Sequence, residues 1–447
     1  MDFSELDERT PRAIAGAVSR AVRSGDLAPG ARLPTVRDVA ADLGVSPATV
    51  SAAWQALRRT GLVVSRGRAG TFVRDTPTAW LSPRVRGLVG AGPERLPFDL
   101  SRGIPDPALL PSLGPALARV SARAATLAYH EEPVLPALRE TLAATWPYPA
   151  ESITVVNGAT DAVGRTLEQL VSYGDRVVLE SPGFPPFFDL VEALGAEVVP
   201  VAVDAEGLRV DALRRALATR PVAVVLQPRA HNPTGAAMTP ERAQALASTL
   251  RRRRAAREVV PWIIEDDHSG AISVTPDVTL GTWLPDRVVH VRSYSKSHGP
   301  DLRIAAVGGP ASLIDRVVAR RMLGPSWTSR MLQSILLDLL TSPDSAEEVS
   351  QARRHYVGRQ HAITTALREH GVVLPPPDGI NLWLPVADVA AASVQLAAAG
   401  IRVATGSAFL ADPDHAVDSH LRVTTGLVTP ADAPHVAAEL AAAARAQ

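Results

Sequence analysis

Cysteine is absent from the sequence, and lysine occurs once in 447 residues, against 45 arginines. The absence of cysteine excludes disulfides and thiolate metal sites, and it is typical of a reducing compartment. Arginine replaces lysine in most surface roles, but it cannot supply a primary amine that loses its proton and condenses with an aldehyde. Lys296 is therefore a candidate covalent residue, with a surface lysine of no special role as the alternative.

Long apolar runs are also absent. No run approaches the roughly 20 residues of a membrane span, and the acidic N-terminus MDFSELDERT lacks the apolar core of a signal peptide. We therefore expect a cytoplasmic protein without membrane contact. A chain of this length predicts two or three domains.

Net charge is zero overall, but the charge is unevenly distributed. Residues 9–74 contain eleven arginines against three aspartates. A basic segment joined to a neutral or acidic body is typical of a nucleic-acid-binding module.

The apolar pattern of this basic segment predicts helices over 11–24, 35–43 and 47–60, with a tight Gly44-Val45 turn between the last two. Ser46 is a good N-cap and Pro47 suits the first helical position. Two short strands, 62–64 and 71–73, then flank a basic tip at 66–70. This order predicts a helix-turn-helix followed by a β-hairpin wing.

The segment resembles the winged helix-turn-helix of the GntR family. The resemblance rests on LPTVRDVA at 33–40, LGVSPATV at 43–50, and the Gly-Leu and Gly-Thr-Phe-Val stretches at 61–62 and 70–73. Pro47 departs from the family, which often has an arginine there. The resemblance implies a domain over 1–74 that binds double-stranded operator DNA through Arg37, Ser46, Thr49, Gly67 and Arg68.

Residues 75–97 contain four prolines and no sustained period, which predicts an extended linker. From residue 98 to 447 short β-branched runs alternate with helical stretches, the first run being 153–156 and the last of the series 304–307. This alternation predicts an α/β fold with a mainly parallel sheet covered by helices on both faces. Further apolar runs predict a small α/β subdomain over about 340–447.

Polar motifs follow several of these strands, where ligands bind in parallel sheets. The turn Asn157-Gly158-Ala159-Thr160 opens a helix, and helix N-termini bind anions. HNPTG at 231–235, EDD at 265–267 and SYSKSHGPDLR at 293–303 follow later strands. In this order they resemble fold type I aminotransferases, which use pyridoxal 5′-phosphate (PLP). The whole chain resembles MocR-type regulators, a GntR subfamily with an aminotransferase-like domain.

The resemblance assigns a role to each motif residue. Lys296 would form the internal aldimine with PLP, and Asp266 would keep the pyridine nitrogen protonated. Asn232 would donate a hydrogen bond to the ring oxygen O3′, and Phe184 would stack on the ring. The phosphate would be held by Ala159, Thr160, Ser293, Ser295, Arg303 and, from the partner subunit of a homodimer, Tyr129.

Two further positions bear on the ligand. His268 stands where the family usually has a tyrosine that donates to O3′; an imidazole can also donate there, but it titrates near neutral pH. Arg422 matches the arginine that clamps the α-carboxylate of an amino acid, with a structural salt bridge as the alternative. No metal site is expected.

The sequence therefore predicts a PLP-dependent transcriptional regulator that senses PLP, or an amino acid or amine effector, at Lys296. The first alternative is an active PLP-dependent aminotransferase with an accessory DNA-binding domain. The second is a DNA-binding protein whose body has lost its cofactor, against which the intact lysine and phosphate residues argue.

Overall fold

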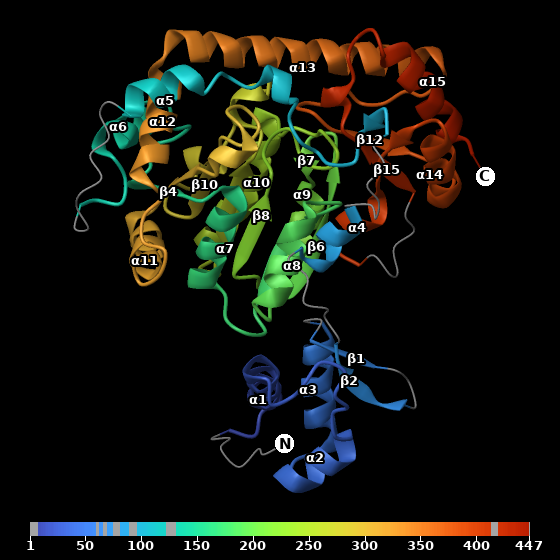
Figure 1. Ribbon diagram of the computed structural model, residues 1–447. Helices are drawn as coiled ribbons and strands as arrows, with labels where there is room; N and C mark the ends of the chain where they lie inside the picture. The colour runs from blue at the N-terminus through green and yellow to red at the C-terminus, as the bar shows by residue number, and fades with distance from the viewer. Residues whose placement is uncertain are drawn as a thin grey trace.

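The computed structural model describes residues 8–59, 62–65, 69–74, 81–88, 96–121, 131–412 and 419–446. Figure 1 shows a small N-terminal lobe and a larger body. None of the helices in these ranges is long and apolar enough to cross a membrane.

The N-terminal lobe is built on three helices and one hairpin. Its elements are α1 (Pro11–Ser24), α2 (Val36–Leu43), α3 (Pro47–Arg59), β1 (Val63–Ser65) and β2 (Thr71–Val73). The three helices pack around a core that includes Ile14, Trp54 and Leu57, all 3% exposed or less. β1 and β2 are antiparallel, with Val64 opposite Phe72. The helix-turn-helix and its hairpin are therefore present as expected.

Local capping explains the sharp turn between α2 and α3. Thr35 and Asp38 form a capping box at the start of α2, and Gly44 ends it in the left-handed region at φ 61°. Ser46 then caps α3, since its Oγ accepts from the amide of Thr49 at 3.2 Å.

The linker contains a short helix, α4 (Pro83–Leu88), where the sequence predicted an extended chain. Arg84 fixes this helix to the body: it donates to Asp189 and Glu192 at 2.7 Å each and lies 5.2 Å from the centroid of the Phe188 ring. A third bond runs to the carbonyl of Ala411 at 3.3 Å. We call these contacts of Arg84 the α4 anchor.

The body is organised around an eight-stranded sheet in the order β4-β11-β10-β9-β8-β5-β6-β7. Its strands are β4 (Ser152–Val156), β5 (Arg176–Ser181), β6 (Glu197–Asp204), β7 (Gly207–Leu208), β8 (Ala223–Leu226), β9 (Trp262–Asp267), β10 (Val288–Ser293) and β11 (Ala305–Gly309). The pairs from β6 through β5, β8 and β9 to β10 are parallel, while β11 and β7 are antiparallel to their neighbours.

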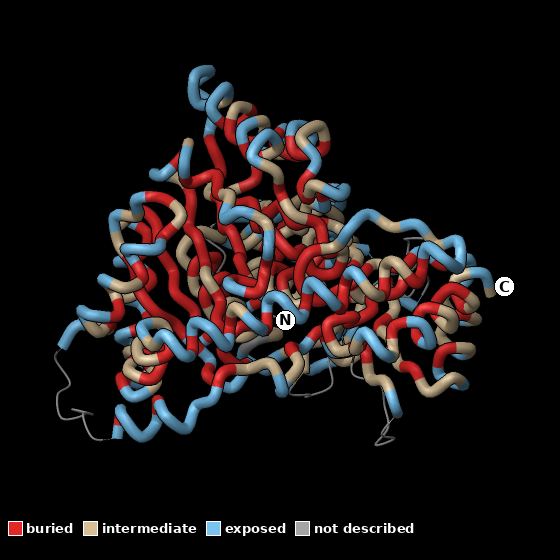
Figure 2. The backbone as a smooth tube through the Cα atoms, turned by 90° about the horizontal axis from the view of Figure 1, so that it is seen from above, coloured by how far each residue is buried: buried red, intermediate tan, exposed pale blue. Residues whose placement is uncertain are grey.

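Helices cover both faces of the sheet, whose strands form the buried centre in Figure 2. One face packs against α6 (Pro136–Ala144), α9 (Val210–Leu217), α10 (Pro240–Ala255) and α12 (Arg330–Thr341). The other packs against α7 (Ala159–Leu170), α8 (Pro185–Ala193) and α11 (Ala311–Met322). Alternate residues of one strand point into the two cores: Val224 belongs to the first and Val225 to the second.

A smaller C-terminal unit follows the long helix α13 (Pro343–Glu369) and has its own core. Its sheet has the order β12-β15-β14, from β12 (Leu382–Pro385), β14 (Ala404–Thr405) and β15 (His420–Val423), with α14 (Val389–Ala398) and α15 (Ala433–Ala444) packed on it. The chain leaving the linker joins this unit, because β3 (Phe98–Asp99) pairs with β13 (Ile401–Arg402). The predicted fold class is thus confirmed in both lobes.

Candidate cofactor site and DNA-binding module

The predicted site residues of the body lie beyond the C-terminal ends of adjacent strands. Asp266 is near the end of β9, Lys296 follows β10, and Asn232 lies in the loop after β8. Since β8, β9 and β10 are parallel neighbours, their ends meet at one edge of the sheet.

Lys296 is directed at the chain that leaves the linker. Its Nζ donates to the carbonyl of Gly103 at 2.5 Å. Burial, with a further contribution from the positive charge of Arg422, lowers the pKa of Lys296 to about 8. An amine with this pKa is uncharged in about one molecule in ten at pH 7, far more often than an ordinary lysine.

Asp266 is a buried carboxylate with one oxygen unpaired. Its Oδ2 accepts from the Gln227 amide at 2.8 Å, while Oδ1 has no hydrogen-bond partner among the described residues. Burial raises its pKa to about 7 although the Gln227 bond opposes that shift. The neighbouring Asp267 points elsewhere and pairs with Arg229 at 2.6 Å. A cationic nitrogen placed at Oδ1 would remove the cost of this lone buried charge.

His268 does not titrate near neutral pH, in contrast to the expectation for an unperturbed imidazole. Burial, followed by the charge of Lys296, lowers its pKa to about 3. Its Nε2 lies 3.2 Å from the hydroxyl of Ser269, and Nδ1 has no partner in the part of the chain described. The neutral ring therefore keeps one nitrogen available for a ligand.

Arg422 is 2% exposed and lies on β15. Its guanidinium donates to Asn232 Oδ1 at 3.3 Å and to the carbonyl of Ser101, and it lies 4.9 Å from the centroid of the Phe409 ring. Burial lowers its pKa to about 10, so it stays charged at neutral pH. No carboxylate partner accompanies it among the described residues, which disfavours the alternative of a structural salt bridge.

A second group of residues forms a cradle at the start of α7. Gly158 is the N-cap, at φ 100°, and no described side chain caps the amides of Ala159 and Thr160. Arg303 lies against this turn: its Nη2 donates to the carbonyl of Asn157 at 3.0 Å, and a Cβ on Gly158 would come within 2.9 Å of the guanidinium. The helix N-terminus and the arginine together favour an anion.

The other cofactor candidates are placed as follows. Ser293 ends β10, and its Oγ accepts from the amide of Ser295 at 3.2 Å. Phe184 is half-buried at the start of α8 and packs edge to face against Phe187, with 5.1 Å between ring centroids. Tyr129 lies outside the described residues.

Three of the DNA-binding candidates lie on or beside the helices of the helix-turn-helix. Arg37 is exposed on α2, and Ser46 is exposed at the start of α3. Thr49 is half-buried, and its hydroxyl lies 2.9 Å from that of Ser46. Gly67 and Arg68 of the wing tip lie outside the described residues.

Comparison with known families matches both lobes. Residues 10–73 match the bacterial regulatory proteins of the gntR family, and residues 97–440 match aminotransferase class I and II. The chain is 35% identical to the vitamin B6 salvage pathway transcriptional repressor PtsJ of Salmonella typhimurium, over 97% of this chain and 98% of that protein. It belongs to the MocR-type GntR regulators.

A second relative agrees with this assignment, and a solved structure shows the fold of the body. The HTH-type transcriptional regulator TauR of Rhodobacter capsulatus is 29% identical over 96% of this chain and 95% of its own. The α-aminoadipate aminotransferase LysN of Thermus thermophilus, solved with N-(5′-phosphopyridoxyl)-L-leucine, has a TM-score of 0.70 at 20% identity, over 80% of this chain and 94% of its own. The prediction of a transcriptional regulator is therefore confirmed, and the aminotransferase alternative is not favoured.

Sequence reasoning missed two parts of the site of this MocR-type regulator. Gln227 joins two predicted residues, since its side chain donates to Asp266 and accepts from the amide of Asn232 at 2.8 Å. Its position directly after a strand, four residues before HNPTG, was the available signal. Ser101 and Gly103, which engage Arg422 and Lys296 through backbone carbonyls, carry no side-chain signal.

Proposed function

We propose that this MocR-type regulator binds PLP at Lys296 and converts binding of an amino compound into a change in operator affinity. The observation that carries the proposal is that the only lysine lies near a buried carboxylate with one unpaired oxygen and near a buried guanidinium that has no carboxylate partner among the described residues. PLP, when bound, supplies an aldehyde carbon that reacts reversibly with amines and a ring that withdraws electrons.

The described residues fit this cofactor at both of its ends. The unpaired Oδ1 of Asp266 would accept from the protonated pyridine nitrogen. Ala159, Thr160 and Arg303 would hold the phosphate at the uncapped start of α7. We assign the O3′ contacts to Asn232 and neutral His268, the ring face to Phe184, and further phosphate contacts to Ser293, Ser295 and the partner subunit's Tyr129.

The effector would be recognised because it replaces hydrogen-bond partners of two side chains, Lys296 and Arg422. An amino acid carries an amine for the cofactor and a carboxylate for Arg422. Its carboxylate would replace the carbonyl of Ser101 at Arg422, and modification at Nζ would release the carbonyl of Gly103. Residues 101–103 follow β3, which itself follows the linker. This exchange of hydrogen-bond partners therefore acts on the segment that leads to the DNA-binding lobe.

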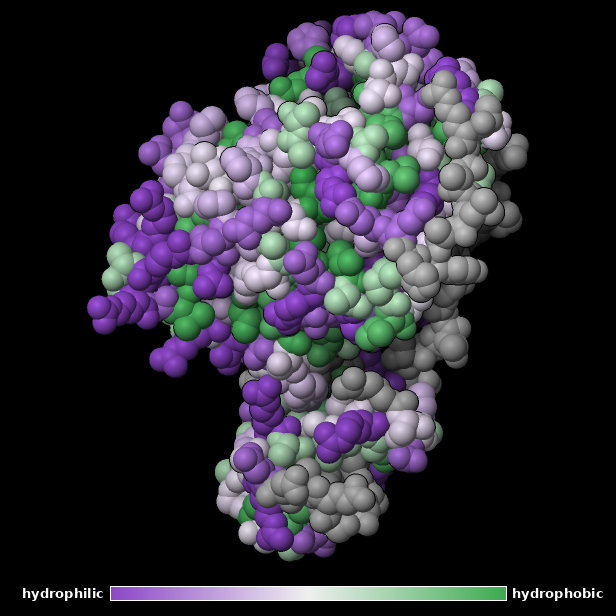
Figure 3. Space-filling view, turned by 90° about the vertical axis from the view of Figure 1, so that its left-hand side faces the viewer, coloured by the Kyte–Doolittle hydropathy of each residue, from purple (hydrophilic) through white to green (hydrophobic). Residues whose placement is uncertain are grey.

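We further infer that the regulator acts as a homodimer on DNA in the cytoplasm. Large exposed hydrophobic side chains occur on α5 (Gly114–Ser121), directly after α11 and on α12: Leu117 is 49% exposed, Leu323 82% and Met331 46%. These helices lie on the side of the body that Figure 3 faces, where hydrophobic residues stand between hydrophilic ones. Such a surface favours a self-complementary interface.

Formation of the covalent link to PLP should depend on pH through Lys296. The attacking species is the uncharged amine, so the rate should rise as pH increases and level off above about 8, following the lowered pKa. Stopped-flow absorbance of apo-protein mixed with PLP measures this rate. A rate that continued to increase up to pH 10 would show that the site does not lower the pKa of Lys296.

Arg37→Ala should weaken operator binding because Arg37 is exposed on the helix that precedes the recognition helix. If it contacts a phosphate, affinity should fall and the slope of log K against log salt should decrease by about 1. Fluorescence anisotropy with DNA from upstream of the regulator's own gene at several salt concentrations measures both. Arg251→Ala, an exposed arginine of α10, is the matched control and should leave both quantities unchanged. If Arg37→Ala and Arg251→Ala had the same affinity and the same salt dependence, Arg37 would not belong to the DNA interface.

A further inference from the structure

A pocket of about 480 Å³ lies between the edge of the large sheet and the C-terminal unit. One side is formed by the ends of β5 and β6 and by the loop after β8, and the other by β12, β15 and residues 373–377. Lys296, Asp266 and Arg422 are not among the described residues that line it. Its size and its place between two structural units are typical of small-molecule sites.

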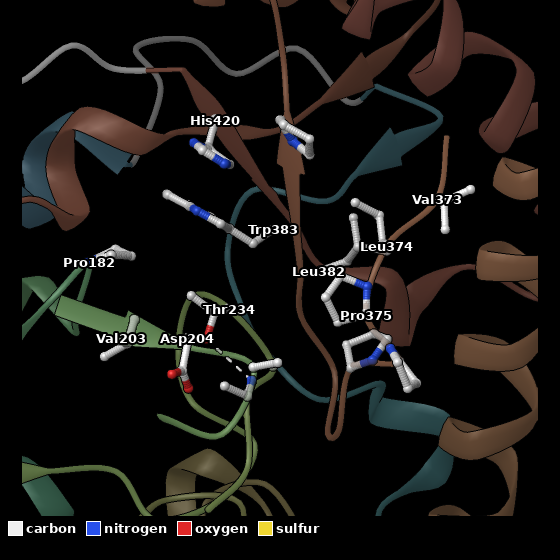
Figure 4. A pocket seen from close by; sticks show the side chains of 16 residues that line it. Pro182, Val203, Asp204, Thr234, Val373, Leu374, Pro375, Leu382, Trp383 and His420 are labelled. Carbon is white, nitrogen blue, oxygen red and sulfur yellow. Dashed lines mark hydrogen bonds between the residues drawn. The ribbon is translucent and has the colours of Figure 1, made fainter. Parts of the chain in front are cut away.

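Two stacked rings form one wall of this pocket. Trp383 on β12 and His420 on β15 are 5.1 Å apart between centroids and inclined by only 6°. Figure 4 shows His420 on one side of the indole, while Asp204 and Thr234 lie across the pocket from its other side. The indole thus offers a face to a planar ligand, and its quadrupole favours a cation there.

The opposite wall supplies negative charge. Among the described lining residues, Asp204 is the one carboxylate. Asp204 is paired with Arg242, but the same guanidinium also binds Glu206 at 2.9 Å. Of these two carboxylates only Asp204 lines the pocket, so its charge is the one that a ligand there would meet. The Asp204 side chain is held by Arg242 through both of its oxygens and is 41% exposed, so a ligand cation can approach it from the pocket without displacing the arginine.

We infer that this pocket is a second ligand site, which takes an aromatic ring bearing a cationic nitrogen. The ring packs on Trp383 and the cation lies toward Asp204. The site is distinct from the proposed cofactor site but is linked to it through one ring: Phe409 packs edge to face against Trp383 at 5.7 Å and also lies under Arg422 at 4.9 Å.

Benzyltrimethylammonium is the probe of choice, because a quaternary nitrogen cannot condense with an aldehyde and so leaves PLP chemistry untouched. Calorimetric titration of full-length, PLP-saturated protein should show one saturable site per chain. Tetramethylammonium, which lacks the ring, and benzyl alcohol, which lacks the charge, should each bind at least about tenfold more weakly. Absence of saturable binding of the probe would overturn the inference.

Three variants locate the site. Trp383→Leu should weaken binding of the probe by about tenfold or more, and Asp204→Asn by about fivefold with benzyl alcohol unaffected. Glu206→Gln also removes a carboxylate from Arg242 but does not line the pocket, so its effect should stay at about twofold or less. Equal effects of Asp204→Asn and Glu206→Gln, or an unchanged affinity in Trp383→Leu, would overturn the assignment. If Trp383→Leu fails to fold, the comparison of Asp204→Asn with Glu206→Gln tests the location of the site instead. Every variant should retain the absorbance of bound PLP. A change in binding of the probe would then concern the second site and not the proposed cofactor site.

Discussion

Lys296→Ala should abolish covalent attachment of PLP and, with it, the response of operator binding to amino compounds. The chain contains no other lysine, so no second ε-amine can replace Lys296 or produce background labelling. Reduction with borohydride followed by intact mass measurement should show one cofactor per chain in the wild type and none in the variant. The absorption band of the covalent adduct between PLP and Lys296 should disappear in parallel.

Lys296→Arg is the matched control for charge. It keeps a cation near Asp266 and Gly103 but cannot supply an uncharged amine near neutral pH. Both variants should still bind PLP without a covalent bond, since the residues at the start of α7 are unchanged. A variant that remained covalently labelled would place the reactive amine elsewhere, at the N-terminus, and would remove Lys296 from the proposed function.

Arg422→Leu should separate recognition of amino acids from recognition of amines. Charge-assisted hydrogen bonds contribute about 1.5–3 kcal/mol each, so loss of a carboxylate clamp should weaken amino acid binding by about 100-fold. Amines that lack the carboxylate should bind the PLP form with little change. Spectral titration with amino acids and with their decarboxylated counterparts measures both affinities.

Arg402→Leu provides the control in the same unit. Arg402 lies on β13, where its side chain approaches Asp99 at 3.9 Å; the described contacts give this side chain no hydrogen bond to Asn232 or to the Ser101 carbonyl that binds Arg422. Its removal should leave both classes of ligand unaffected. A parallel loss of amino acid and amine binding in Arg422→Leu would assign Arg422 a structural role, because a clamp acts only on ligands that carry the carboxylate.

The parts of the molecule that the sequence predicts are those fixed by local physics. Strands such as residues 288–293 are short segments rich in valine, a residue that packs well on a sheet. Ser46 and Thr35 cap helices through bonds to residues three positions away. The motifs at 231–235 and 293–303 follow strands whose parallel order places their ends together.

The parts that escaped prediction depend on contacts between distant segments. The partners of Arg422 at Ser101 and Asn232 are 321 and 190 positions away in the chain. The pKa of His268 falls because of burial, which its own sequence neighbours do not reveal. Trp383 and His420 become one wall only when β12 and β15 pair. In each case the sequence shows the residue type, but only the folded structure shows which groups surround it.

The α4 anchor has a geometric consequence for the DNA target. Because Arg84 fixes α4 to the body, only residues 75–80 remain between the small lobe and a fixed point. Such a segment spans at most about 25 Å, whatever path it takes. In a dimer, two tethers of this length would restrict the distance between the recognition helices. A whole turn of DNA inserted between the half-sites would move them about 34 Å further apart, which is more than one such tether can span, so this insertion should weaken operator binding strongly.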